Sequence, residues 1–187
     1  MEKQKTITPS ILRVALATAA LLMVPALAMQ FTDEVDWKVG DFIIMGVLIF
    51  GIGLSYVLIS RFGSSLIYKA GVALALCTTF LMIWANLAVG LIGAGPHWGN
   101  LMYIGVVAVC IIGVISSHFS TAGMERAMYV TASTLVLVAI IALSANMHEY
   151  PGSSVAEIIG VNGFFATLYA ISGAFFRYLT LEKSAKE

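Results

Sequence analysis

Charged residues are scarce in this sequence. Only 11% of its 187 residues are Asp, Glu, Lys or Arg, whereas 60% are hydrophobic. Soluble domains carry about 25% charged and about 45–50% apolar residues. A water-soluble fold of this length could not bury so much apolar surface, so the composition predicts that a lipid bilayer surrounds most of the chain. Ten basic residues balance ten acidic ones, and no nucleic-acid partner is expected.

The sequence has only two cysteines and none of the common catalytic motifs. The two cysteines, Cys77 and Cys110, both lie inside apolar runs, which predicts small buried hydrophobic side chains. Their spacing fits no zinc, iron–sulfur or haem-attachment motif. The sequence contains no Gly-x-Ser-x-Gly, no His-Glu-x-x-His and no phosphate-binding loop. We therefore expect a protein that is not an enzyme, with no metal and no cofactor.

Long apolar runs dominate what is present. A membrane-spanning helix needs about 20 mostly apolar residues, and backbone groups in lipid must be satisfied within the segment, which favours helices. Short connections and the absence of a linker predict one domain over residues 1–187. The sequence thus predicts an all-α integral membrane protein, a bundle of six transmembrane helices. These are residues 11–29, 41–60, 66–94, 100–119, 124–147 and 156–180.

The first run has two interpretations. Lys3, Lys5 and Arg13 precede an apolar stretch that ends in Pro25 and Ala26-Leu27-Ala28, as in a cleaved secretory signal. The run is also long enough to span a bilayer if the Arg13 side chain extends to the surface. We favour a retained helix, and five helices remain the alternative.

The basic residues predict the orientation. With six spans, all but one of the Lys and Arg residues fall on the side of the N-terminus, and only Lys38 falls on the other side. Basic residues concentrate on the cytoplasmic side of membrane proteins, so both termini are expected in the cytoplasm. The basic residues on that side are Lys3, Lys5, Arg13, Arg61, Lys69, Arg126, Arg177, Lys183 and Lys186.

An acidic stretch separates the first two spans. It contains Asp33, Glu34 and Asp36, and Asp41 opens the second helix, where a carboxylate caps free N–H groups. We interpret it as a solvated loop followed by an N-cap, with a metal site as the alternative.

Polar residues in the outer half of the spans form the candidate site. Asn86 is expected about six residues before its helix ends, roughly 9 Å below the outer boundary. Intramembrane polar groups are costly unless they find partners, which makes them functional candidates. The alternative is that the Asn side chains only bridge helices. The candidate pocket residues are Trp84, Asn86, His97, Asn100, Tyr103, Asn146, His148 and Asn162.

Small residues recur along two of the predicted helices. Gly46 and Gly53 share one face of the second, while Gly160 and Gly163 mark a face of the sixth together with Ala166 and Ala170. Small residues let helix backbones approach closely in a bilayer. They indicate packing within the bundle or, on the sixth helix, a seam between copies of the chain.

Four sequence stretches carry a resemblance. They are Trp84-Ala-Asn-Leu-Ala-Val-Gly-x-Ile-Gly, Asn100-Leu-x-Tyr-x-Gly-Val, Met29-Gln-Phe-Thr-Asp-Glu-Val and Asn162-Gly-Phe-Phe. In these the chain resembles a group of small bacterial inner-membrane proteins with no established activity. The resemblance implies a multi-pass protein of the bacterial inner (cytoplasmic) membrane, and no mechanism.

Two functional classes remain open. The first is a non-enzymatic membrane protein that acts through its helix surfaces, as an accessory subunit of a membrane complex or a small homo-oligomer. The second is a facilitative channel or carrier for a small neutral solute, which would use the outer polar pocket. No charged residue is expected near the middle of any span, which argues against an ion-coupled pump.

Overall fold

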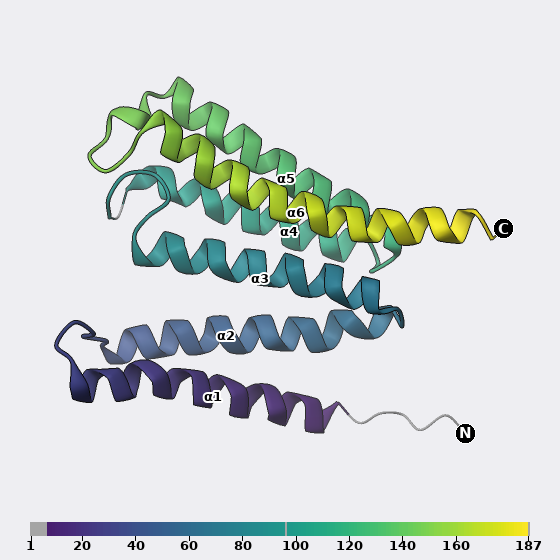
Figure 1. Cartoon of the computed structure of the whole chain (residues 1–187), viewed down its shortest axis with the longest axis horizontal. Coiled ribbons are helices and arrows are strands. Elements are labelled where there is room, and N and C mark those ends of the chain that lie inside the picture. The colour runs from purple at the N-terminus through teal and green to yellow at the C-terminus, as the bar shows by residue number, and fades with distance from the viewer. Residues whose placement is uncertain (1–6, 96, 187) are drawn as a thin grey trace. The chain divides into compact units, whose positions relative to one another are not determined.

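The computed structural model describes residues 7–95 and 97–186. Helix accounts for 82% of the chain, and no strand occurs among the described residues. Among the described residues, six helices are long and apolar enough to span a membrane, with η2 and α4 counted together as one (Figure 1). The α-helices are α1 (Thr8–Phe31), α2 (Val39–Ile59), α3 (Leu66–Ala88), α4 (Met102–Ser116), α5 (Thr121–Ser144) and α6 (Val155–Ser184); short 3-10 turns are η1 (Ser60–Phe62), η2 (Trp98–Leu101) and η3 (Met147–Glu149).

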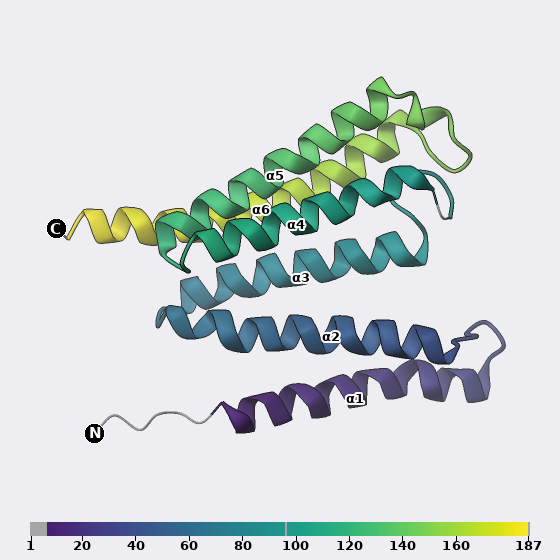
Figure 2. The ribbon, with the colours of Figure 1, turned by 180° about the vertical axis from the view of Figure 1, so that it is seen from behind.

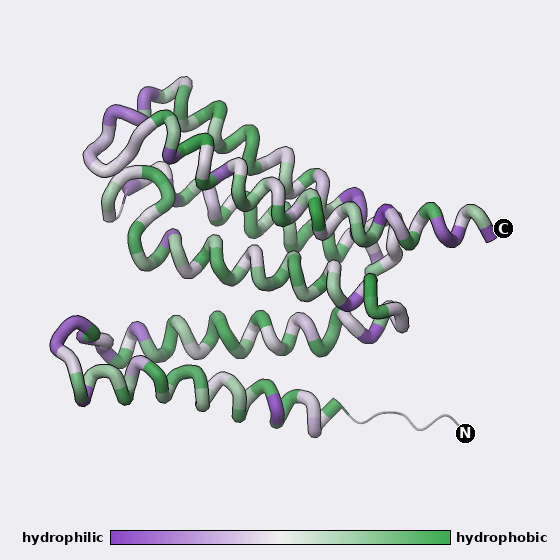
Figure 3. Tube along the Cα trace, in the orientation of Figure 1, coloured by the Kyte–Doolittle hydropathy of each residue, from purple (hydrophilic) through white to green (hydrophobic). Residues whose placement is uncertain are grey.

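Polar residues concentrate at the helix ends, and apolar residues fill the helix middles (Figure 3). Serine side chains cap the N-terminal ends of three of the α-helices. Ser65, Ser120 and Ser154 each accept a hydrogen bond from the backbone N–H three residues ahead, at 3.0–3.2 Å. These are ordinary N-caps, which satisfy one of the free N–H groups of the first turn. Asp41 was expected as an N-cap but stands three positions after Lys38, whose N–H it binds at 2.8 Å.

The chain divides into two compact units. The first, residues 1–61, is the hairpin of α1 and α2. Its helices approach closely at glycines: a Cβ on Gly53 would lie 2.7 Å from Val14 Cγ1, and one on Gly46 would lie 3.3 Å from Leu22. Gly46 and Gly53 therefore pack α2 against α1, as expected for small residues on one helix face. That the whole chain forms one domain stays a prediction.

The second unit, residues 62–187, contains α3 to α6. Helix α6 packs against α3 and α5, and α5 packs against α4, while α3 and α4 scarcely touch (Figure 2). Helices α3 and α6 also approach closely at a glycine: a Cβ on Gly71 would lie 2.9 Å from the ring of Phe176. The Ser172 hydroxyl donates to the Gly71 carbonyl at 2.8 Å and joins the same two helices. The large buried side chains of this unit include Tyr68, Met82, Met128, Leu135, Tyr169 and Phe176, each at most 2% exposed.

Two expectations about α3 are wrong. The helix was expected to reach residue 94, but it ends at Ala88, because Gly90, Gly93 and Gly95 take positive φ angles of 78°, 70° and 83°. Glycine adopts this left-handed conformation at no steric cost, so the backbone leaves the helix there. Asn86 consequently lies in the last turn of α3 and not several residues below its end. Cys77, expected to be buried, is exposed on α3, whereas Cys110 is buried as expected.

Candidate site at the turn between α3 and α4

Asn100 organises the turn between α3 and α4. Its side chain is 8% exposed and makes four hydrogen bonds to that turn. Oδ1 accepts from the N–H groups of Leu91 and Ile92, both at 2.9 Å. Nδ2 donates to the carbonyls of Ile92 at 3.2 Å and Gly95 at 3.3 Å. Both ends of the carboxamide are therefore used within the chain, and Asn100 holds the turn closed.

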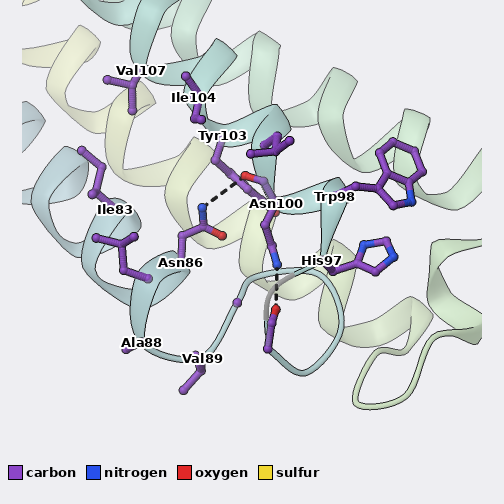
Figure 4. A pocket seen from close by; sticks show the side chains of 14 residues that line it. Ile83, Asn86, Ala88, Val89, His97, Trp98, Asn100, Tyr103, Ile104 and Val107 are labelled. Atoms are coloured by element: carbon purple, nitrogen blue, oxygen red, sulfur yellow. Dashed lines mark hydrogen bonds between the residues drawn. The ribbon is translucent and has the colours of Figure 1, made fainter.

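Asn86 and His97 also contact this turn. Asn86 Nδ2 donates to the Asn100 carbonyl at 3.2 Å, and Figure 4 shows its carboxamide reaching from α3 toward α4. His97 Nδ1 accepts from Gly99 N–H at 3.0 Å and caps η2, which requires this nitrogen to carry no proton. The His97 ring packs on Tyr150 at a centroid distance of 4.1 Å, and in Figure 4 it projects away from Asn86.

Tyr103 and Asn162 form a buried pair between α4 and α6. Tyr103 is 2% exposed and Asn162 is 1% exposed. The Tyr103 hydroxyl donates to Asn162 Oδ1 at 3.3 Å, and Asn162 Nδ2 donates to the Ile158 carbonyl at 2.9 Å. This arrangement matches the alternative in which Asn side chains bridge helices.

A cavity of about 830 Å³ lies between the end of α3, the following turn and the start of α4. It gathers four of the eight candidate residues: Asn86, His97, Asn100 and Tyr103. Its remaining walls are mostly hydrocarbon, from residues that the sequence did not single out. They include Ile83, Leu87, Ile104 and Val107, together with Trp98.

The other candidates lie outside this cavity. Trp84 is 45% exposed near the end of α3, and Asn146 is exposed just beyond α5 with a left-handed φ of 54°. His148 lies in η3, and its Nδ1 is buried without a hydrogen-bond partner among the described residues. The eight residues therefore do not form one polar pocket. Four line an apolar cavity, Asn162 bonds to one of those four, and three lie elsewhere.

Sequence reasoning missed a second polar group, which we call the central cluster. It consists of Thr79, Cys110, Thr131 and Tyr169, one residue from near the middle of each of the helices α3 to α6. The Thr79 hydroxyl donates to the Ala75 carbonyl, so Tyr169 donates to Thr79, with 2.7 Å between the oxygens. The Cys110 thiol lies beside the hydroxyls of Thr79, Thr131 and Tyr169. Threonine and tyrosine residues inside long apolar runs were the sequence feature that could have indicated this cluster.

No group of three or more His, Cys, Asp or Glu side chains comes together within residues 7–95 and 97–186 to hold a metal ion. In the acidic stretch between α1 and α2, the Thr32 hydroxyl accepts from the Glu34 N–H at 3.1 Å, as in an ordinary turn.

Comparison with known proteins identifies no relative, since no protein family, curated protein or solved structure matches the chain.

Proposed function

We propose that this is a non-enzymatic multi-pass membrane protein that acts through its helix surfaces, as an accessory subunit of a membrane complex or as a small homo-oligomer. The observation that carries the proposal is a set of glycines on outward-facing helix surfaces. Gly160 and Gly163 on α6 are exposed, and a Cβ at either of them would meet nothing within 4 Å.

Glycine inside a helix costs about 1 kcal/mol relative to alanine. Close packing offsets this cost where a second helix uses the space, as at Gly53 and Gly71. Gly160 and Gly163 have no such neighbour among the described residues, although packing within the bundle was one expectation for them. Small residues at helix–helix interfaces in membranes permit close backbone contact, so these two positions favour a partner helix from outside the chain.

The hairpin of α1 and α2 supports the same proposal. None of the apolar stretch of α2 and only 6% of that of α1 is buried. Val47 on α2 is 69% exposed and Leu16 on α1 is 62% exposed. Within the first unit itself, the two helices therefore leave most of their apolar surface uncovered.

A channel or carrier for a small neutral solute receives less support. The side chains of Asn100 and Asn162, which would line its polar pocket, are engaged by the protein's own backbone and Tyr103. Large side chains such as Met128 and Tyr169 fill the middle of the second unit and are not exposed. These contacts favour a binding role over a permeation path.

The mass of the assembly that the protein forms in mild detergent tests the proposal. Native mass spectrometry should find the 20.0 kDa chain in a discrete larger assembly, either with itself or with another subunit. Replacing both glycines, Gly160→Leu and Gly163→Leu, should shift the chain toward the monomer, because the new side chains block close approach. Gly105→Leu, at an exposed position on α4 with open space around it, should leave the assembly intact. A wild-type chain that is monomeric with only lipids attached contradicts the proposal.

We further propose a bacterial inner-membrane location with both termini in the cytoplasm, supported by the one-sided distribution of Lys and Arg. Labelling with a membrane-impermeant maleimide tests it in spheroplasts, with both native cysteines replaced by alanine. Glu149→Cys, at an exposed position, should react in intact spheroplasts. Lys183→Cys should react only after the membrane is permeabilised, and the reverse pattern contradicts the orientation.

A further inference from the structure

A second cavity, of about 390 Å³, lies between the end of α3 and the start of α6. It is distinct from the cavity between α3 and α4, although Val89 and Gly90 line both. The two turns beside it pack on each other. The Ala94 N–H donates to the Pro151 carbonyl at 2.9 Å, and a Cβ on Gly152 would lie 2.7 Å from Ala94 Cβ. The cavity therefore belongs to a closely packed part of the second unit.

One face of α6 forms the floor of this cavity. Glu157, Gly160 and Phe164 follow one another at spacings of three and four residues, which places them on the same side of the helix. All three line the cavity and all three are exposed. A Cβ at Gly160 would meet nothing within 4 Å, so open space separates the carboxylate from the phenyl ring. The seven-residue step along α6 puts about 10 Å between these two ends of the floor.

The opposite wall of the cavity is hydrocarbon, from Ala85 and Val89 at the end of α3 and from Leu91 in the following turn. Small-molecule sites are mostly apolar, hold a few placed polar groups and measure about 300–1,000 Å³, and this cavity lies within that range. Its volume encloses one hydrocarbon chain, but not both chains of a phospholipid. The walls therefore favour a ligand with a single apolar chain.

The charge in the cavity selects the polar group of the ligand. Among the residues that line the cavity, Glu157 alone is ionisable, and neither ion pair among the described residues includes it. No Lys or Arg occurs in residues 70–125 or 127–176, so the basic residues of the second unit lie toward the other ends of its helices. The N-terminus of a helix carries only about half a positive charge, so the Glu157 carboxylate leaves this end of the cavity net negative. A cationic group is complementary to it.

We propose that this cavity binds an amphipathic cation, a single hydrocarbon chain that ends in an ammonium group. The ammonium group pairs with the Glu157 carboxylate, and the chain crosses Gly160 and contacts the ring of Phe164. A neutral polar group gains no ion pair at Glu157, and an anionic group is repelled. The site goes beyond the proposed role as a subunit and does not depend on it, because all its residues belong to one chain and a monomer retains them.

Equilibrium binding to the full chain in phosphatidylcholine nanodiscs tests the site, with protein-free nanodiscs measuring partition into the lipid. The probes are radiolabelled decylammonium, decanol and decanoate, which share a hydrocarbon chain of similar length and differ in the charge of the polar group. The wild type should bind one decylammonium per chain with about fivefold preference over decanol, as for an exposed ion pair, and should bind decanoate most weakly. Glu157→Gln should remove this preference. Glu149→Gln should keep it, because Glu149 is also exposed but does not line the cavity.

The apolar end has its own pair of variants. Phe164→Ala should weaken the binding of all three probes about tenfold, because the ring no longer covers the chain. Ile159→Ala is the matched control, since both side chains lie on α6 at 55% and 54% exposure and only Phe164 lines the cavity.

Three results overturn the proposal. The first is equal binding of decylammonium and decanol by the wild type, or no saturable binding at all. The second is the same preference for decylammonium in the Glu157→Gln and Glu149→Gln proteins, which removes the ion pair. The third is equal binding by the Phe164→Ala and Ile159→Ala proteins, which removes the cavity as the binding place.

Discussion

Replacing Asn100 with leucine should destabilise the second unit more than any other change of a single polar side chain. Leucine is similar in size to asparagine but has no hydrogen-bonding group. The substitution would leave the N–H groups of Leu91 and Ile92, now bonded at 2.9 Å, without an acceptor. It would also remove the donor to the carbonyls of Ile92 and Gly95.

The magnitude follows from these four groups. Each buried N–H left without a partner costs about 1–3 kcal/mol. Two of them give a loss of roughly 2–6 kcal/mol in the free energy of unfolding, if water satisfies the two carbonyls. Asn146→Gly is the control, because Asn146 is exposed, makes no cap hydrogen bond and has the positive φ that glycine tolerates. It should change the stability by less than about 0.5 kcal/mol.

Unfolding in mixed micelles with a rising fraction of SDS measures the difference, followed by tryptophan fluorescence. Hydrogen exchange adds a local measurement, since the amides of Leu91 and Ile92 should exchange much faster in the Asn100→Leu protein. A loss below about 0.5 kcal/mol together with unchanged exchange at these two amides would refute the role assigned to Asn100.

Two further predictions concern the interior of the second unit. Tyr169→Phe removes the 2.7 Å hydrogen bond to Thr79. It should lower the free energy of unfolding by about 0.6–1.7 kcal/mol in the same assay. In a double-mutant cycle with Thr79→Val, additive losses would show that the two hydroxyls do not interact. Gly113→Leu should cost about 1–3 kcal/mol, because a Cβ there would already lie 3.0 Å from Ala127 Cβ. Gly105→Leu on the same helix has open space and should be neutral or slightly stabilising, so equal losses at both glycines would contradict the close approach of α4 and α5.

The sequence predicted the number and the approximate position of the helices, because six long apolar runs separated by polar turns leave few other arrangements. The helix ends were less predictable. Leu91 and Ile92 are apolar and extend the run beyond Ala88, but three positive-φ glycines end the helix there. The sequence shows that glycines are present here, but it does not show that their φ angles are positive, and it is the positive φ that ends the helix.

The candidate site was predicted only in part for a related reason. Polar residues near the outer helix ends suggested one pocket, and four of them do line one cavity. Whether an asparagine faces a ligand or its own backbone depends on tertiary contacts, which the pattern does not contain. Asn100 and Asn86 both lie beside the turn between α3 and α4, yet Asn100 has both side-chain polar atoms engaged and Asn86 has a buried oxygen without a partner among the described residues. The apolar walls of this cavity had no distinguishing signal in a sequence so rich in isoleucine and valine.

The turn that Asn100 closes also bears on how the chain enters a membrane. The turn's own backbone groups are satisfied by a side chain that is synthesised after them, at the start of the next helix. Until that residue leaves the ribosome and its insertion channel, Leu91 and Ile92 have to keep water as their hydrogen-bond partner, since lipid offers none. In a lipid environment the turn between α3 and α4 can therefore exclude water only once Asn100 is in place.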